Sequence, residues 1–417
     1  MNAYKDTLTL GFRNGVVNLL AATGDPIAAL LQGSPEADTY GLMERVRAKG
    51  PVVRSRVGLN MVTSRALCEE VLRDRRFNTR DAKGRPASYD PLLVGSPMNG
   101  SFIELDPPDH TRLRRIAAPN FRPQAIRARE DQVRAVADRL LDRLEGKTEF
   151  DLMRDFAAPF PIAVISELFG IEGVDHERFT EMGTLVGGTL AGVRTAEQAA
   201  GLRRASRDLT TLFAGLLAER RRAPKDDLLS ALANAQDDEV MTAEEAVKTC
   251  CLLLIAGFET TVNLIGNGVA ALMSSGQWDR LRDDPSLAER VVEETLRYDS
   301  PVQGAIRHVN ENLVLGGRDL PKGSIVVTLI AAANRDPGVY RDPDRFDLDR
   351  TGEPDHLSFG GGIHYCLGAP LARLEGRVAF EALAKRFPRI AAAPGAKRRE
   401  GMVIRGYRSL PVRLPVR

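Results

Sequence analysis

The segment FGGGIHYCLG, residues 359–368, places one cysteine, Cys366, in a run that holds four glycines. The next residues, LGAPLARLEGRVAFEALAKRF, carry apolar side chains at helical spacing, and Pro370 fits only the first turn of such a helix. Cys366 therefore comes just before a helix N-terminus, where free backbone N–H groups and the helix dipole favour a thiolate. A thiolate in a glycine-lined slot can be a nucleophile or an axial metal ligand, whereas a lone buried cysteine is more often inert.

Composition narrows the class of protein. The chain has 417 residues, of which 43% are hydrophobic and 27% charged, as expected for two lobes or one large enzyme domain. The net charge of +2 predicts no nucleic-acid partner. The four cysteines show no zinc spacing and form no disulfide framework, which favours a reducing cytoplasm. The first twenty residues contain no apolar core typical of a signal peptide or membrane anchor.

Hydrophobic periodicity predicts a fold that is mainly α with a smaller β region. Residues 125–144, 202–221 and 286–298 repeat apolar side chains at helical spacing. Short strand patterns occur at 51–57, 60–64, 305–309 and 325–330, and in the tail from residue 402 onward. Strands and helices do not alternate as βαβ units, so a parallel α/β sheet is not expected.

The longest apolar segment, residues 250–273, is long enough to span a bilayer. Glu259, Asn263 and Asn267 interrupt it, which favours a buried core helix and no membrane anchor. Its centre reads AGFETT, residues 256–261, where a glycine, an acid and two hydroxyls form a polar notch in an apolar wall. Such a notch can hold a diatomic ligand and pass protons. An equally weighted alternative is a kinked helix whose Glu259 reaches the surface.

Two further motifs are weak by themselves. In EETLR, Glu294 and Arg297 stand at i and i+3 of a predicted helix, a spacing usually found in weak surface pairs. In DPPDHTRLRR, residues 106–115, His110 and Arg114 fall on one helix face and together can hold a carboxylate or phosphate. A solvated basic helix is the favoured interpretation of that motif alone.

The order HTRLR, AGFETT, EETLR and FGGGIHYCLG resembles the cytochrome P-450 family, in particular the soluble bacterial haem-thiolate monooxygenases. ANRDP at 333–337 and DPDRFD at 342–347 fit the segment that this family carries before its cysteine. The resemblance runs from about residue 35 onward. It implies one cytochrome P-450 catalytic domain over residues 1–417, with an N-terminal extension of roughly residues 1–34 and no fused reductase domain.

The resemblance assigns roles by position. It implies that Cys366 is the axial ligand to the iron of haem b, and that Glu259 and Thr260 deliver protons to iron-bound O2. It assigns Ala256 and Gly257 to an oxygen groove, and Glu294 and Arg297 to a structural network shared with Arg335 or Arg350. The implied haem contacts, which include the propionate-binding side chains, are His110, Arg114, Arg307, Phe359, His364 and Gly368.

The resemblance also implies electrons from NAD(P)H, delivered by a separate ferredoxin and ferredoxin reductase. Four arginines can form a basic docking face or can be ordinary solvated charges, and both interpretations stay open. These residues are Arg112, Arg115, Arg373 and Arg377. The implied substrate is an apolar small molecule, such as a polyketide, terpenoid, steroid or fatty acid, beneath a lid that includes residues 92–105 and 183–193. Candidate substrate contacts are Met98, Phe258, Val302, Ala305, Ile306, Met402 and Val403.

Three functions stay open at this point. The first is hydroxylation or epoxidation by a cytoplasmic monooxygenase, and the second is coupling or desaturation by the same haem. The third is a haem-thiolate sensor without turnover. Glu259 and Thr260 argue against the sensor, because a sensor has no need of a proton relay.

Overall fold

The computed structural model describes residues 14–87, 98–171, 179, 182–183, 185–186, 195–237 and 240–414. It confirms the predicted mainly α fold with smaller sheets. The helices are α2 (Pro26–Gln32), α3 (Thr39–Arg47), α4 (Arg65–Arg73), α5 (Asp109–Ala117), α6 (Pro123–Arg127), α7 (Glu130–Asp142), α8 (Pro159–Phe169), α10 (Ala196–Arg222), α11 (Leu228–Asp237), α12 (Ala243–Ser274), α13 (Trp278–Asp283), α14 (Ala288–Tyr298), α15 (Ile330–Ala333) and α16 (Ala369–Arg386).

The strands are short and form four small sheets. Their bounds are β1 (Val52–Arg54), β2 (Leu59–Val62), β3 (Phe77–Asn78), β4 (Glu149–Asp151), β5 (Ala305–Val309), β6 (Leu313–Leu315), β7 (Arg318–Leu320), β8 (Ile325–Thr328), β9 (Ala391–Ala392), β10 (Lys397–Arg398), β11 (Tyr407–Ser409) and β12 (Pro411–Arg413). The largest sheet has the order β1-β2-β8-β5-β3, and β4-β12-β9, β10-β11 and β6-β7 form the others. In the large sheet β2 and β8 are parallel, and the other pairs are antiparallel.

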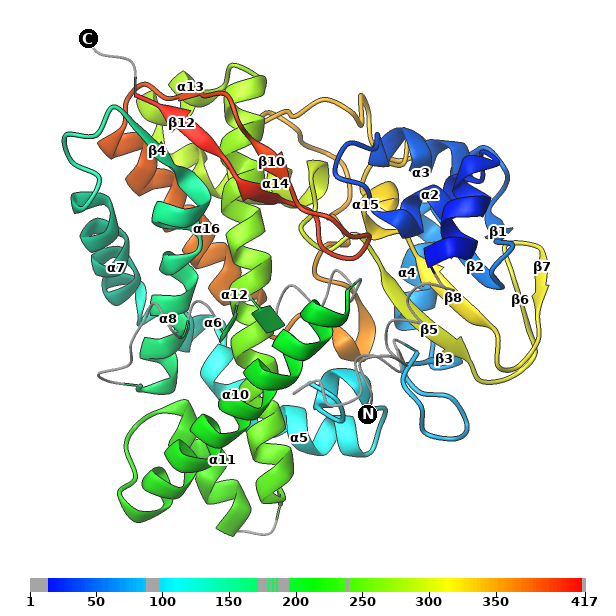
Figure 1. The fold of residues 1–417 in the computed structure, drawn as a ribbon, viewed down its shortest axis with the longest axis horizontal. Coiled ribbons are helices and arrows are strands. Elements are labelled where there is room, and N and C mark those ends of the chain that lie inside the picture. Colours follow the sequence, from blue (N-terminus) through cyan, green and yellow to red (C-terminus); the bar gives the residue numbers. More distant parts are fainter. Residues whose placement is uncertain are drawn as a thin grey trace.

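Helix α12 is the centre of the molecule. Figure 1 shows it running through the helical part, while the large sheet and α2 to α4 lie to one side of it. A capping box starts α12, because Thr242 and Glu245 each bond the other's backbone N–H. The helix has the length and apolar character of a membrane span, but 83% of its most apolar window is buried inside the protein. It is therefore a core helix, as predicted.

One predicted boundary was wrong. Residues 125–144 form two helices, α6 and α7, because the chain leaves helical geometry at Arg129, whose φ and ψ are −98° and 4°. Within the predicted N-terminal extension, α2 buries Ile27 and Leu30 in one cluster with Met61 of β2 and Val327 of β8.

Candidate active site

The Cys366 loop joins the sheet region to α16. Cys366 N–H donates to the Phe359 carbonyl over 2.8 Å, and the residue as a whole is half-buried. Burial raises the pKa of Cys366, while backbone N–H groups of Gly368 and Ala369 and the charges of nearby arginines oppose that rise. The helix start therefore favours a thiolate, as the sequence predicted, but here burial outweighs it.

The loop glycines have two different functions. Gly362 has φ of +62°, and a Cβ there would lie 2.5 Å from the Leu72 carbonyl oxygen of α4. Gly361 also faces Leu72, so these two glycines let the loop pack on α4. Gly368 differs, because a Cβ at this position would meet nothing within 4 Å, so the space at this residue is open.

Four cationic or imidazole side chains gather next to the Cys366 loop. The ring centroids of His110 and His364 are 4.4 Å apart, and Arg114 donates to the Tyr365 carbonyl over 2.5 Å. Burial lowers the pKa of His110, Arg114 and Arg307, and lowers that of His364 to about 3. The sequence placed these side chains at three distant positions, and the fold brings them together from α5, β5 and the loop.

These side chains have too few partners. Both ring nitrogens of His110 and Nε2 of His364 are buried without a hydrogen-bond partner among the described residues. Arg307 is 9% exposed, and its guanidinium donates a hydrogen bond to its own neighbour, the Ile306 carbonyl. Buried donors are normally satisfied, so the cluster fits an anionic group that lies between them.

The predicted notch is present on α12. Ala256, Gly257 and Thr260 are half-buried, whereas the residues around them on this helix are buried. Thr260 Oγ1 donates to the Ala256 carbonyl over 2.9 Å, and Thr261 Oγ1 donates to that of Gly257 over 3.2 Å. Such bonds to the preceding turn bend a helix locally. Ala256, Gly257 and Thr260 therefore line an opening with one hydroxyl in it.

The environment of Glu259 resolves the alternative that the sequence left open. It is 1% exposed, so it does not reach solvent, and its Oε1 lies 2.6 Å from Arg399 Nη2. The pair is a close ion pair, although its angles fall short of a hydrogen bond. Burial raises the pKa of Glu259, and Arg399 and the Asn263 side chain oppose the rise.

Glu294 and Arg297 are a buried network and not the weak surface pair that the spacing alone favoured. Their side chains are 5% and 3% exposed, and two hydrogen bonds of 2.8 Å join them. Arg350 joins this network through a 3.3 Å contact with Glu294. Arg335 bonds instead to Tyr298 and Asp344, so the prediction of Arg350 was correct and that of Arg335 was wrong.

Comparison with known proteins identifies the family. The family model described as Cytochrome P450 matches residues 28–279 and 276–393. The chain is a cytochrome P450. Cytochrome P450 107B1 of Saccharopolyspora erythraea is 42% identical over 339 residues, which cover 80% of each protein. The polyketide biosynthesis cytochrome P450 PksS of Bacillus subtilis is 36% identical and is covered over 95% of its length by 90% of this chain. The ligand-free crystal structure of Mycobacterium smegmatis CYP164A2 has a TM-score of 0.84 at 37% identity, covering 93% of this chain and 99% of that one.

The family uses a haem iron and O2, and the residues of this P450 fit a haem. The unpartnered ring nitrogens of His110 and His364 and the neighbouring guanidinium groups of Arg114 and Arg307 suit the two propionates, and this cluster lies beside the Cys366 loop. Phe359 is 9% exposed between this loop and Arg373, whose guanidinium lies 4.5 Å from the ring centroid.

The candidate substrate contacts of this P450 have unequal support. Val302, Ala305, Ile306, Met402 and Val403 are half-buried, and Gln303 N–H joins their two segments by donating to the Val403 carbonyl over 2.8 Å. Met98 packs at the edge of the main core. Phe258 is 2% exposed and packs against Gly183, so it does not face accessible space. Most of the predicted lid, residues 92–97 and much of 183–193, lies outside the described residues.

The predicted basic docking face is largely neutralised. Arg112 pairs with Glu245 and Asp109, Arg373 with Glu293, and Arg377 with Glu130. Arg115 is exposed, and among the described residues no ion pair is recorded for it. The structure therefore favours ordinary helix ion pairs for three of these four arginines.

Sequence reasoning missed two residues of this site. One is Arg399, which is separated from Glu259 by 140 positions and gives no local signal. The other is Glu375 on α16, which is 1% exposed and has an unpartnered Oε2. Burial raises the pKa of Glu375 well above its ordinary value, and the Thr261 hydroxyl opposes the rise. Glu375 lies on the stripe of Leu371 and Val378, so a charged residue on an apolar face was a signal that could have been used.

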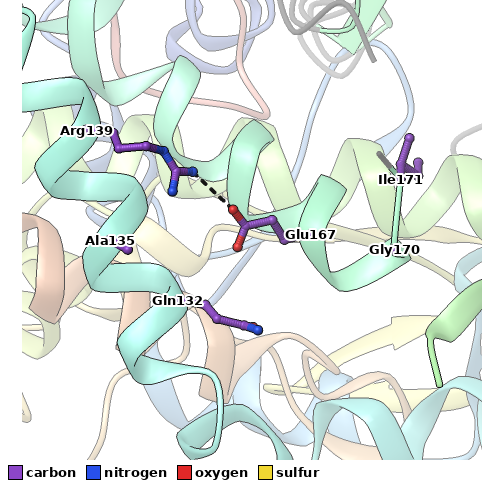
Figure 2. A pocket seen from close by; sticks show the side chains of 6 residues that line it. All are labelled: Gln132, Ala135, Arg139, Glu167, Gly170 and Ile171. Atoms are coloured by element: carbon purple, nitrogen blue, oxygen red, sulfur yellow. Dashed lines mark hydrogen bonds and ion pairs between the residues drawn. The ribbon is translucent and has the colours of Figure 1, made fainter. Parts of the chain in front are cut away.

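A separate cleft of about 420 Å³ lies between α7 and α8 (Figure 2). Arg139 and Glu167 form an ion pair of 3.1 Å across it, and Gln132, Ala135, Gly170 and Ile171 complete its wall. It contains none of the candidate active-site residues. The cleft is therefore not the site of the chemistry.

Proposed function

We propose that this P450 inserts one atom of O2 into an apolar small molecule as a hydroxyl group or epoxide. The buried cluster of His110, His364, Arg114 and Arg307 beside the Cys366 loop is the observation that carries the proposal, because its unpartnered imidazole nitrogens and two guanidinium groups suit a dianionic ligand next to a thiol. We propose a single catalytic domain over residues 1–417 that works in the cytoplasm. Its electrons come from NAD(P)H through a separate ferredoxin and ferredoxin reductase.

The cofactor in this proposal is haem b. Cys366 holds the iron, His110, Arg114, Arg307 and His364 hold the propionates, and Phe359 and Gly368 contact the ring. When bound, a thiolate-ligated haem supplies oxygen activation, because the thiolate donates electron density that favours O–O cleavage.

The protein's own residues control protons and water. Thr260 presents its hydroxyl at the opening formed with Ala256 and Gly257, and Glu259 is the buried acid next to it in the chain. In the structure the Thr260 hydroxyl donates its hydrogen to the Ala256 carbonyl. Its oxygen lone pairs therefore remain able to accept a hydrogen bond from a proton donor. Apolar residues around the notch exclude other water.

The substrate class follows from the half-buried apolar residues at the β5 end and the Met402 loop. We propose an apolar molecule of the polyketide, terpenoid, steroid or fatty-acid type. The relative PksS is named for polyketide biosynthesis, which supports secondary metabolism as the setting. Val302, Ala305, Ile306, Met402 and Val403 are the proposed contacts, with Met98 at the lid.

The first experiment is the absorption spectrum of the reduced protein with carbon monoxide. The proposal expects a strongly red-shifted Soret band, and Cys366→Ser as the matched control should lose that shift. A band at the position of histidine-ligated haem, or no bound haem, would overturn the proposal. Screening apolar compounds by the spin-state change of the haem then tests the substrate class.

A further inference from the structure

Three polar residues of α12, Glu259, Asn263 and Asn267, follow one another at intervals of four and so share one face of the helix. This face lies against the hairpin of β10 and β11. Asn267 Nδ2 donates to the Arg405 carbonyl over 3.2 Å, and a side chain at Gly406 would collide with Asn263. The hairpin therefore covers the polar stripe of the core helix, and Glu259 stands at one end of that stripe.

Arg399 is the hairpin residue that meets Glu259. Its backbone N–H donates to the Gly406 carbonyl over 3.0 Å, which fixes the start of the loop. Its guanidinium lies 2.6 Å from Glu259, and its side chain is 18% exposed while that of Glu259 is 1% exposed. Arg399 is thus the link between a buried acid and the solvent.

No second cation shares this role within the described chain. The neighbouring hairpin arginines, Arg398 and Arg405, are both bound to Asp299. The groups that act on the Glu259 carboxyl are Arg399 and the Asn263 side chain, while α8, α10, α14 and α16 contribute no charge to it. The charge state of Glu259 therefore depends on one arginine.

We propose that Arg399 is a positioning residue that keeps Glu259 ionised near neutral pH and so sets the pH range in which Glu259 takes up and passes on protons. The inference rests on the proposed function, in which Glu259 serves Thr260. An arginine stays protonated throughout, so it holds the acid's charge without being a proton carrier itself. Burial without a partner would instead leave the acid neutral and unable to accept a proton.

The test is an infrared titration of the Glu259 carboxyl in the haem-loaded protein, with Glu259→Gln used to assign its C=O band. Loss of an opposite charge at this range raises a carboxyl pKa by about one to three pH units. Arg399→Gln should therefore move the midpoint upward by about one to three pH units. Arg399→Lys should restore most of that shift, because it keeps the charge.

Arg398→Gln is the matched control, since this arginine is next in the chain and faces Asp299 instead. It should leave the Glu259 midpoint unchanged. An unchanged midpoint in Arg399→Gln, or a Lys variant that behaves like the Gln variant, would overturn the inference. The spectrum of the reduced protein with carbon monoxide tests the proposed function separately from the role of Arg399. A red-shifted band together with an unchanged Glu259 midpoint rejects the role of Arg399 and leaves the proposed function standing. If Arg399→Gln does not bind haem, the Lys variant carries the test: its midpoint should stay close to that of wild type, and a rise of about one to three pH units, as expected for loss of the charge, rejects the inference.

Discussion

Replacing Arg297 by methionine tests whether the Glu294 network holds this part of the fold together. Arg297 donates five hydrogen bonds, two to Glu294 and three to the carbonyls of Asn334, Pro343 and Arg345. Methionine keeps much of the side-chain volume but leaves the buried Glu294 with the longer contact to Arg350 and the hydrogen bond from the Asp347 N–H as its partners. Removal of one partner from a buried pair costs about 3–5 kcal/mol.

That cost converts into a melting temperature. Unfolding entropy of about 2.1 cal/mol/K per residue gives roughly 0.9 kcal/mol/K for the chain, so the variant should melt about 3–6 °C lower. Circular dichroism follows the helices, and fluorescence of Trp278, the one tryptophan of the chain, reports on the packing of α13. Both signals should shift together.

Arg290→Met is the matched control on the same helix. Arg290 is exposed and donates a hydrogen bond to the Leu348 carbonyl over 3.1 Å. Exposed interactions of this kind contribute about 0–1 kcal/mol, so the control should melt within about 1 °C of wild type. If Arg297→Met melts no lower than Arg290→Met, the network is not the stabilising element and the reasoning fails.

Three further variants test the site. Thr260→Ala should divert NAD(P)H consumption from product to peroxide, and the control Thr261→Ala should do so much less. The measurement is the peroxide formed per NAD(P)H consumed. Equal values in the two variants would count against the relay. Arg307→Met should weaken haem binding about tenfold or more, because a hydrogen bond to a charged group contributes about 1.5–3 kcal/mol. The measurement is the transfer of haem to an acceptor protein, and unaltered transfer would contradict the propionate assignment. Hydrogen bonds from Arg112 lower the pKa of Glu245 to about 2, so Glu245→Gln should lose about 1–2 kcal/mol at neutral pH. Because the folded pKa is depressed, the difference from wild type should disappear as pH falls from about 4.5 to about 2, and a difference that persists in acid would refute the ion pair.

Local patterns of the sequence predicted the elements well. The alternation at 305–309 became β5 with the same bounds, because a strand's pattern depends only on which side chains alternate. The helix predicted over 286–298 begins slightly later, at Ala288, after a single 3₁₀ turn at Pro285–Leu287. Such shifts are normal at helix ends, where the backbone hydrogen bonds change partner.

The environment of each side chain was much less predictable. The spacing of Glu294 and Arg297 is the same on a surface and in a core, so only the packing of Arg350 and the carbonyls around them reveals a buried network. The glycines at 361 and 362 contact α4, which lies almost three hundred positions earlier in the chain, and no local pattern indicates that contact. Motif order predicted which residues matter, and tertiary structure determined what they touch.

The polar stripe of α12 explains both why this helix is buried in the core and how the C-terminal hairpin reaches the proposed proton-carrying acid. Burying Glu259, Asn263 and Asn267 in an apolar core is unfavourable unless each finds a partner. Arg399 pairs with Glu259, and the Asn267 side chain donates to the Asp299 and Arg405 carbonyls. The hairpin that satisfies these groups also contains Met402 and Val403 between Arg399 and Gly406. The loop that is proposed to contact the substrate is thus fixed at one end by the ion pair to the proposed proton-carrying acid. A change in the Arg399–Glu259 pair should therefore alter the position of this loop, and a change in the loop should alter the pair.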